Sequence, residues 1–487
     1  MRWTILFCLL NVCSCYKVLL VFPFPFKSHS ILGRGFVRNL LSAGHEVTYV
    51  TPFALNSSHP KLYQVSLNLS STHFEKYLDI KPLLERAEPM NYWDVFGLMR
   101  GVTEMAAKDI YSGFSALYDC PFIWFFPYDQ YLEIFRVMHT PPNPAYTPNL
   151  RTRNIPPFTF QQRVQELWYS ITTLFYRTYY YTPVEKGIYK NFFASAMSKR
   201  GKKLPDYDAV RFNASLAFSN AYVTMRDVSE TPTALKNIGG FHIDTKLESL
   251  SQKLQDIMDR STHGVILFSM GTHLTSRGLP KLVSEFVETF RRLKYTVLWK
   301  TNEANLTLPS NVIPLQWIPQ VSVLDHPNCV LFITHGGLMS ITESVHFGKP
   351  IVGIPAYSDQ FINVRIAVKN GFAKEVKLSL DLGNELFDAI NEVVNNPRYT
   401  QRAKEMSLIY HSRIAKPGAE LVHWVQHVIE TKGAQHLRSA ALQMPLYQKC
   451  YLDLIIIVII LLTILRYIAR RTFERLTRKT NGIKKTN

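Results

Sequence analysis

Short apolar runs alternate with amphipathic segments through the second half of the chain. The runs at 263–270, 295–299, 329–334 and 350–355 are each bounded by turn residues, which is typical of buried strands. The segment 279–293, which lies between the first two runs, carries Leu and Phe at helical spacing and predicts an amphipathic helix. Helical patterns also follow the last two runs. Strands that alternate with helices predict an α/β fold with a parallel sheet, in which ligands bind beyond the carboxyl ends of the strands.

The first half opens with the same alternation. Apolar runs at 17–22 and 46–50 predict two strands, and the residues between them predict a loop up to Ser30 followed by a helix over 31–41. This pattern is again a βαβ unit. The Gly-containing stretch 231–253 reads as the linker between the two halves.

Aromatic residues and prolines concentrate in one stretch of the first half, residues 84–189. Ordinary core packing accounts for most of these side chains. The remainder suggests an apolar acceptor cavity, a surface that touches a membrane, or both.

Both ends of the chain differ from this globular body. Arg2, the apolar run 5–12 and the small residues up to Cys15 predict a secretory signal peptide over residues 1–15. Near the other end, residues 454–465 carry no charge, and the wider segment 451–469 is long enough to span a bilayer. A buried strand at the first end and a buried core helix at the second are the alternatives.

The formal net charge of +18 is unevenly distributed along the chain. From Arg466 onward, eight Lys and Arg face Glu474 alone, which gives this tail +7 and, with Arg2 set aside, leaves +10 on the body. The positive-inside rule then places the tail, 470–487, in the cytosol and the body in the lumen. Lys484 and Lys485 resemble the dilysine signal of endoplasmic-reticulum membrane proteins, so we expect a single-pass type I protein of that membrane. Because the charge gathers behind a spanning segment, nucleic-acid binding loses its support.

Cysteine usage indicates a body that does not depend on disulfides. Three of the six cysteines fall in the predicted signal peptide, and the other three are too widely spaced for a disulfide framework or a zinc site. In a lumenal body, four Asn-X-Ser/Thr triplets are plausible glycan sites; they start at Asn56, Asn68, Asn213 and Asn305.

The residues with most chemical potential lie between 314 and 360. The strand 329–334 runs into His335-Gly336-Gly337 and then directly into a helix, an arrangement that turns backbone N–H groups toward an anion. Glu343 follows on that helix and suits ribose hydroxyls, and Trp317 with Gln320 could hold a base. Taken singly, His335 could be a helix cap, Trp317 a core aromatic residue and Glu343 a solvated charge.

Taken together, these motifs resemble the signature of the UDP-glycosyltransferase family, in particular its membrane-bound animal branch with arthropod-like features. The resemblance covers almost the whole chain. It implies two facing Rossmann-like domains, the GT-B architecture, followed by one transmembrane helix. The expected division is a signal peptide at 1–15, an acceptor-binding domain at 16–245, a UDP-sugar-binding domain at 246–443, a transmembrane helix at 451–469 and a basic tail at 470–487.

The resemblance also assigns roles to individual residues. Trp317 would stack on uracil, Gln320 and Glu343 would contact ribose, and His335 would bind diphosphate. Phosphate and sugar contacts complete the set that is expected to bind the UDP-sugar: Ser269, Gly271, Thr272, Gly337, Ser340, Asp359 and Gln360. Many vertebrate members carry an Asn where this chain has Met339, so Ser340 or backbone N–H groups would have to replace that ligand.

The first half is expected to supply the catalytic base. The family carries a histidine after the first strand, and His29 matches it; imidazole titrates near neutral pH and suits proton removal from an acceptor hydroxyl. The family's orienting acid matches Glu104 best and Asp109 second. The spacing from His29 to Glu104 is short for the family and the apolar run before Glu104 is weak, which suggests that the first half has lost a strand and a helix.

The expected activity is inverting transfer of glucose or glucuronic acid from a UDP-sugar to a hydroxyl of a small lipophilic acceptor. Neither a cofactor nor a metal is expected, because Asp206-Tyr207-Asp208, although spaced as in metal-dependent glycosyltransferases, reads as an ordinary loop. The rival hypothesis is a catalytically impaired homologue that still binds UDP-sugar or a lipophile. The sequence leaves the oligomeric state, including a homo-oligomer, open.

Overall fold

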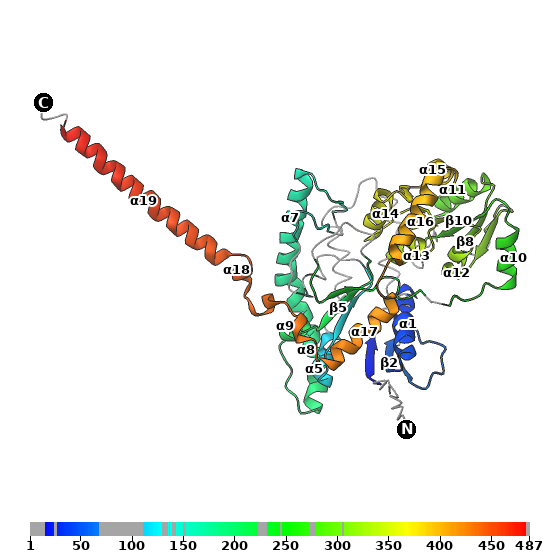
Figure 1. Cartoon of the computed structure of the whole chain (residues 1–487), viewed down its shortest axis with the longest axis horizontal. Helices are drawn as coiled ribbons and strands as arrows, with labels where there is room; N and C mark the ends of the chain where they lie inside the picture. Colours follow the sequence, from blue (N-terminus) through cyan, green and yellow to red (C-terminus); the bar gives the residue numbers. More distant parts are fainter. Residues whose placement is uncertain are drawn as a thin grey trace, which may run out of the picture. The chain divides into compact units, whose positions relative to one another are not determined.

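The structure is a computed structural model of the whole chain (Figure 1). It describes residues 15–23, 27–67, 111–128, 135, 137–138, 143–149, 152–222, 231–243, 246–271, 279–303 and 306–483, of which 446 and 476–483 are described by their backbone only. The chain divides into two compact units, Met1–Leu437 and Arg438–Asn487, and each is described by itself.

A six-stranded parallel sheet forms the centre of the second half, with strand order β12-β11-β10-β7-β8-β9. The strands are β7 (Val265–Ser269), β8 (Thr296–Lys300), β9 (Val312–Leu315), β10 (Cys329–Thr334), β11 (Ile351–Gly353) and β12 (Ala373–Glu375). The helices are α10 (Gln252–Arg260), α11 (Pro280–Arg291), α12 (Gln320–Asp325), α13 (Leu338–His346), α14 (Gln360–Lys369), α15 (Gly383–Asn395) and α16 (Pro397–His411). This doubly covered parallel sheet confirms the predicted α/β fold of the second half.

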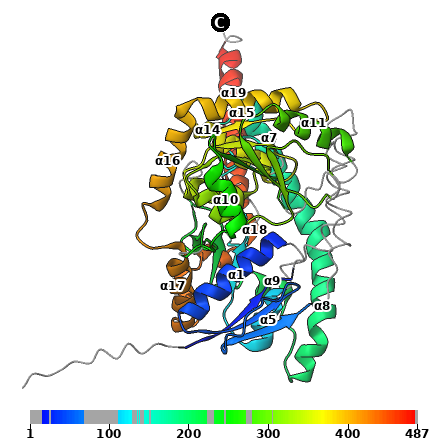
Figure 2. The same cartoon turned by 90° about the vertical axis from the view of Figure 1, so that its right-hand side faces the viewer.

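Strand β7 shows why this sheet needs helices on both faces. All five of its residues are buried, and the four apolar ones alternate between two core clusters. Ile266 and Phe268 pack with residues of α11 and α15, whereas Val265 and Leu267 pack with residues of α10, α13 and α16. A continuous apolar run is typical of a strand that is covered on both faces. The burial of β7 therefore confirms the prediction that the run 263–270 forms a buried strand. Figure 2 shows α10, α11, α15 and α16 around the sheet.

The first half contains two three-stranded parallel sheets, β1-β2-β3 and β4-β5-β6. The strands are β1 (Lys17–Val21), β2 (Glu46–Thr51), β3 (Leu62–Ser66), β4 (Ile123–Phe126), β5 (Leu216–Ser219) and β6 (Leu235–Asn237). The helices are α1 (Lys27–Ser42), α5 (Gly113–Tyr118), α7 (Phe160–Tyr176), α8 (Thr182–Lys199) and α9 (Tyr207–Arg211), and the π-helix η2 (Arg177–Tyr181) joins α7 to α8. The parallel pairing of β1 with β2 around α1 confirms the predicted βαβ unit.

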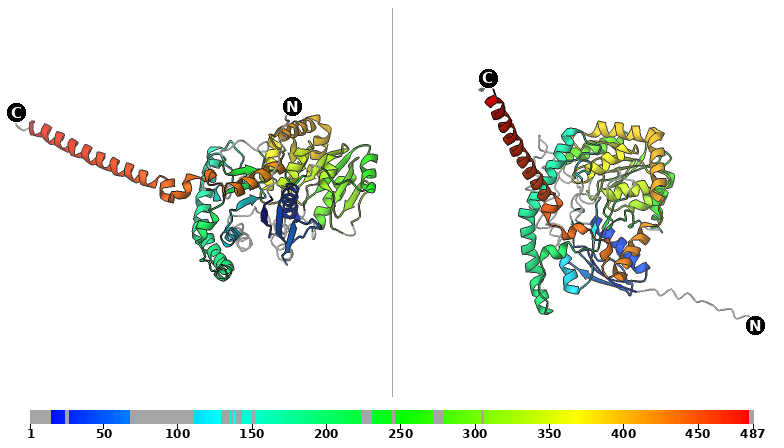
Figure 3. Two further views of the ribbon diagram at one scale, coloured as in Figure 1. Left: turned by 60° about the horizontal axis from the view of Figure 1, so that its bottom comes forward. Right: turned by 60° about the vertical axis from the view of Figure 1, so that its left-hand side comes forward.

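One hydrophobic core unites both sheets of the first half. Phe22, which follows β1, has its ring centroid 5.8 Å from that of Phe125 in β4, and Phe36 of α1 packs 4.9 Å from Phe125. Helix α17 (Pro417–Glu430) contributes Leu421 and Val425 to the same core, although it comes late in the chain. It lies beside α1, as Figure 3 also shows. The two halves are therefore joined by packing as well as by the connecting chain.

Three expectations about local structure were wrong. The stretch 231–253 is not wholly a linker, because β6 pairs with β5 and Phe241 is buried in the core of the first half. Helix α1 begins at Lys27 and not at Ile31, so His29 lies in its first turn. The third concerns Asp206, which caps α9 by accepting hydrogen bonds from the backbone of Asp208 and Ala209, so this stretch is a helix start and not an ordinary loop.

The second unit contains one long helix, α19 (Leu452–Ile483), preceded by two short ones, η5 (Ala440–Gln443) and α18 (Leu446–Lys449). Within α19, Leu452–Arg475 has a mean hydropathy of 2.6, and its most apolar window buries nothing against protein. The predicted span 451–469 falls almost wholly within this helix. By length and composition α19 is a candidate membrane-spanning helix, and its exposed apolar surface disfavours the alternative of a buried core helix.

Candidate functional site

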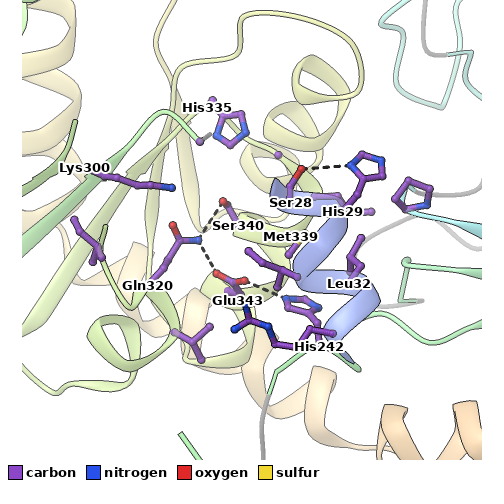
Figure 4. Close-up of a pocket in the computed structure, with 18 of the residues that line it drawn as sticks. Ser28, His29, Leu32, His242, Lys300, Gln320, His335, Met339, Ser340 and Glu343 are labelled. Carbon is purple, nitrogen blue, oxygen red and sulfur yellow. Dashed lines mark hydrogen bonds and ion pairs between the residues drawn. The ribbon is translucent and has the colours of Figure 1, made fainter. Parts of the chain in front are cut away.

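A cavity of about 540 Å³ lies between the carboxyl ends of the strands of the second half and the start of α1 in the first half. Figure 4 shows side chains from both halves pointing into it. Its walls include ten of the thirteen predicted site residues: His29, Gly271, Trp317, Gln320, His335, Gly337, Ser340, Glu343, Asp359 and Gln360. Ser269 is buried next to the cavity, where its Oγ accepts a hydrogen bond from the backbone of Gly271 at 3.4 Å. Glu104 and Thr272 lie outside the described residues, as does Asp109.

His335 and two glycines form an anion-binding corner. Gly271 has φ of +82°, and a Cβ at this position would lie 2.8 Å from the His335 ring. A Cβ at Gly337 would lie 2.6 Å from His335 Nε2. Only glycine leaves the imidazole room between these two backbones. Because Gly337 is the N-cap of α13, the unpaired N–H groups of that helix start face the same corner.

Glu343 is buried, so the reading of a solvated charge is wrong. One carboxylate oxygen accepts a hydrogen bond of 2.6 Å from Gln320 Nε2, and the other lies 3.1 Å from Nε2 of His242. Gln320 also donates to Ser340 Oγ at 3.3 Å. A buried carboxylate with two polar neighbours is held in one orientation, which suits a group that must accept hydrogen bonds from vicinal hydroxyls.

Sequence reasoning missed His242, because the residue falls in the stretch read as a linker. His242 is 6% exposed, and its Nδ1 has no hydrogen-bond partner within the described part of the chain. Gly35 of α1 leaves room for it, since a Cβ there would lie 3.0 Å from the His242 Cα. Arg38, one turn further on, donates to the carbonyls of Phe241 and His242. No pattern in the sequence marks this histidine.

Trp317 is 54% exposed on the cavity wall, which excludes a core role. Lys300 Nζ lies 4.9 Å from the centre of its ring, a cation–π distance. Burial lowers the pKa of Lys300, and Lys27 lowers this pKa further while Glu343 opposes the change. Sequence reasoning missed Lys300 too, although a charged residue at the carboxyl end of the buried strand β8 was the available signal.

Asp359 and Gln360 are fixed by the turn that begins α14. The side-chain amide oxygen of Gln360 accepts hydrogen bonds from the backbone N–H groups of Ala356 and Tyr357, at 2.9 and 3.1 Å. Asp359 accepts a hydrogen bond of 2.8 Å from Asn363, whose amide also donates to the Gly336 carbonyl. The turn is thus tied to the glycines of the anion-binding corner. Burial raises the pKa of Tyr357 to about 12, so this phenol stays neutral.

His29 enters the cavity from the opposite side. Helix α1 presents it in its first turn, and Ser28 Oγ lies 3.4 Å from His29 Nδ1. Leu32, one turn later, and Tyr128 from the end of β4 line the same region and add an apolar surface. The structure therefore places the predicted base on the wall opposite the predicted donor-binding residues (Figure 4).

Met339 has a packing role that explains its departure from the expected pattern. Its side chain packs against the core cluster of the first half while it lines the cavity. An apolar residue here contributes to the contact between the two halves. Ser340 also lines the cavity, and its Oγ is oriented by Gln320.

Asp206 and Asp208 have structural partners. Asp208 pairs with Lys186 at 2.6 Å and with Arg211 at 2.7 Å. Among the residues that the structure describes, no group of three or more His, Cys, Asp or Glu side chains is arranged to hold a metal ion.

Comparison with known proteins identifies the family. The sequence model described as UDP-glucoronosyl and UDP-glucosyl transferase matches residues 114–487. The chain belongs to this family. UDP-glucosyltransferase 2 of Dactylopius coccus is 29% identical over 471 residues, which are 90% of this chain and 89% of that protein. UDP-glucuronosyltransferase 2B15 of Rattus norvegicus is 34% identical over 220 residues, 45% of this chain and 41% of the rat protein.

Solved structures agree on the fold. The calicheamicin glycosyltransferase CalG4 superimposes with a TM-score of 0.54 and 16% identity, over 86% of this chain and 98% of that one. The glycotransferase of kitacinnamycin matches equally well, with a TM-score of 0.54 and 99% of its chain covered. The protein is a UDP-glycosyltransferase of GT-B fold, as its sequence signature predicted.

Proposed function

We propose that this UDP-glycosyltransferase transfers glucose or glucuronic acid from a UDP-sugar to a hydroxyl of a small lipophilic acceptor, with inversion at the anomeric carbon and without a metal. The observation that carries the proposal is His29 on the cavity wall opposite His335, Glu343 and Trp317. A direct displacement needs a base and a donor site that face each other across one space, and this cavity offers both.

Each group has a chemical task in this scheme. The acceptor oxygen attacks the anomeric carbon, the bond from that carbon to the UDP oxygen breaks, and His29 takes the hydroxyl proton. The departing UDP gains negative charge, which His335, the N-terminus of α13 and the Lys300 ammonium would stabilise. Glu343 would hold the ribose and Trp317 the uracil.

The first test is the replacement of His29 by Ala in the full-length chain. We expect turnover to fall by about two to four orders of magnitude while UDP affinity is kept, because the base touches the acceptor and not the nucleotide. Turnover would be measured with UDP-glucose and UDP-glucuronate against a panel of phenols. The matched control is His59→Ala, which removes an exposed histidine from a loop away from the cavity. Unchanged turnover in His29→Ala would contradict the assignment of the base.

A second candidate is a catalytically impaired homologue that binds UDP-sugar or a lipophile. It is favoured by the short spacing between His29 and Glu104 in the first half. The same assay separates the two functions. An impaired homologue would bind UDP with ordinary affinity and turn over neither donor with any acceptor in the panel.

We also propose that the body is lumenal and that α19 anchors it in the endoplasmic-reticulum membrane. The candidate spanning helix and the basic residues that follow its apolar part support this placement. No cofactor is part of the proposal, since the UDP-sugar is a co-substrate.

A further inference from the structure

Helix α7 faces the wrong way for a helix of a soluble body. Its buried side chain is a glutamate, Glu166, at 1% exposure. Eight apolar side chains on the helix and its π-helical extension are 47% to 71% exposed: Phe160, Val164, Leu167, Trp168, Ile171, Leu174, Phe175 and Tyr179. An amphipathic helix of a globular protein ordinarily buries its apolar face.

The eight apolar side chains form one stripe, which we call the α7 stripe. They follow one another by one, three or four positions, which places them on a single face of the helix. Twenty residues from Phe160 to Tyr179 make this stripe about 30 Å long at 1.5 Å per residue. Figure 1 shows α7 along the outer edge of the body.

The orientation of α7 is fixed by the polar contacts of Glu166. This carboxylate, on the face opposite to the stripe, accepts hydrogen bonds from Asn154 at 2.9 Å, from the backbone of Asn149 at 3.0 Å and from Thr152. Burial raises the pKa of Glu166, and these hydrogen bonds act against that rise. Turning the stripe inward would carry Glu166 to the outer face and leave its partly buried donors, the Asn149 N–H, Thr152 and Asn154, without their acceptor, which is costly.

The charge around the stripe favours a lipid surface. Residues 160–184 contain no acidic residue besides the buried Glu166, Arg163 lies beside the stripe, and Tyr and Trp supply amphipathic rings. Arg177 adds no free charge, because it pairs with the buried Glu185 at 2.8 Å. The chain itself brings a bilayer near. Fourteen residues, 438–451, separate the first unit from α19, and a chain of that length reaches at most about 50 Å.

We propose that the α7 stripe lies in the surface of the same bilayer that α19 crosses, as a second membrane contact of the body. The stripe would lie at the boundary between lipid headgroups and acyl chains. Trp168 and the tyrosines are favoured at this depth, and Leu167 and Ile171 would contact the acyl chains. This inference rests on the proposed anchoring by α19. The contact would set the distance of the catalytic body from the membrane and place α7 where lipophilic acceptors dissolve.

The test uses the full-length chain in phosphatidylcholine vesicles with and without phosphatidylserine. All cysteines except Cys329 are replaced by Ser, since Cys329 is buried and its pKa is raised to about 11, which keeps it unreactive. A polarity-sensitive dye is then attached at Ile171→Cys or at Glu288→Cys, an exposed control position on α11. Flotation of the vesicles reports the anchor, and quenching by nitroxide-labelled lipids reports the surroundings of the dye.

The expected result is a blue-shifted dye at position 171 that nitroxide lipids quench several-fold more strongly than the dye at 288. Equal quenching at both positions in chains that float would overturn the docking of α7 and leave the anchor intact. Chains that do not float would overturn the anchor and the docking together. Disulfide formation between two unlabelled Ile171→Cys chains, together with no lipid quenching in the labelled chains, would assign the stripe to a second copy of this chain, and the lipid proposal would be wrong.

Discussion

Single side chains around Glu343 hold the carboxylate that we propose for ribose binding. Its two oxygens are already engaged by Gln320 and His242, and both neighbours come from outside α13. His242 belongs to the first half, so the carboxylate of the donor site is oriented in part by the acceptor half. Residues that touch no substrate can therefore govern donor affinity.

We expect His242→Ala to weaken UDP binding by roughly tenfold, or about 1–2 kcal/mol, because a buried carboxylate loses a polar partner. His242→Gln keeps one donor and is expected to recover part of the affinity. Titration calorimetry with UDP measures the effect, and kcat at saturating donor should change little. If His242→Ala binds UDP as tightly as the unmodified chain, His242 has no positioning role.

At the scale of elements, sequence patterns predicted the second half well because burial dominates there. Strand β10 begins and ends where its apolar run does, since Cys329 follows a turn and Thr334 precedes His335. The three-residue strand β6 carried no such signal, and its pairing with β5 depends on contacts far away in the chain. The start of α1 was missed because the polar residues Lys27 and Ser28 are as compatible with a first helical turn as with a loop.

The same contrast applies to the site. Trp317 and Glu343 are recognisable because their types and spacing form a signature. His242 and Lys300 reach the cavity only through the tertiary fold, which brings one from the first half and the other from the neighbouring strand β8. His242, which is placed by packing between the halves, leaves no local pattern to read, whereas the position of Lys300 at the end of the apolar run of β8 was a signal that could have been used.

Helix α13 contains a pH-sensitive residue at its end. Burial lowers the pKa of His346 to about 4, with the neighbouring His411 as the second cause. The unfolded chain binds a proton on this histidine below about pH 6.5 and the folded chain only near pH 4, so the free energy of unfolding falls as pH falls through this window.

Replacing His346 by Phe keeps a ring against Tyr410 and removes the titration. We compare the free energy of unfolding of His346→Phe with that of the unmodified chain. The difference should shift in favour of His346→Phe by about 2 kcal/mol when the pH is lowered from neutral to about pH 4.5. Denaturant unfolding at both pH values measures this difference. A stability difference that does not vary with pH would show that His346 titrates alike in the folded and unfolded chains.

At the scale of the whole molecule, topology is the property that links the body, α19 and the basic tail. Two of the four glycosylation triplets fall in described regions, and the side chains of Asn56 and Asn213 are both exposed. Exposure is a requirement for glycan attachment, and a lumenal location is the other. The two asparagines therefore report on which side of the membrane the body lies.

We expect glycosidase treatment of the chain in microsomes to increase its electrophoretic mobility. Asn56→Gln and Asn213→Gln should each remove one step of that shift.

In sealed microsomes, we expect trypsin to cleave only in the Arg- and Lys-rich C-terminal part of α19, because the membrane shields the body. Lys432→Ala, an exposed substitution in the body, is the control that should not alter this protection. If trypsin degrades the body in sealed vesicles and both asparagines are unglycosylated, the inferred topology is wrong. The basic tail would then lie in the lumen, contrary to the positive-inside rule from which its cytosolic location was inferred.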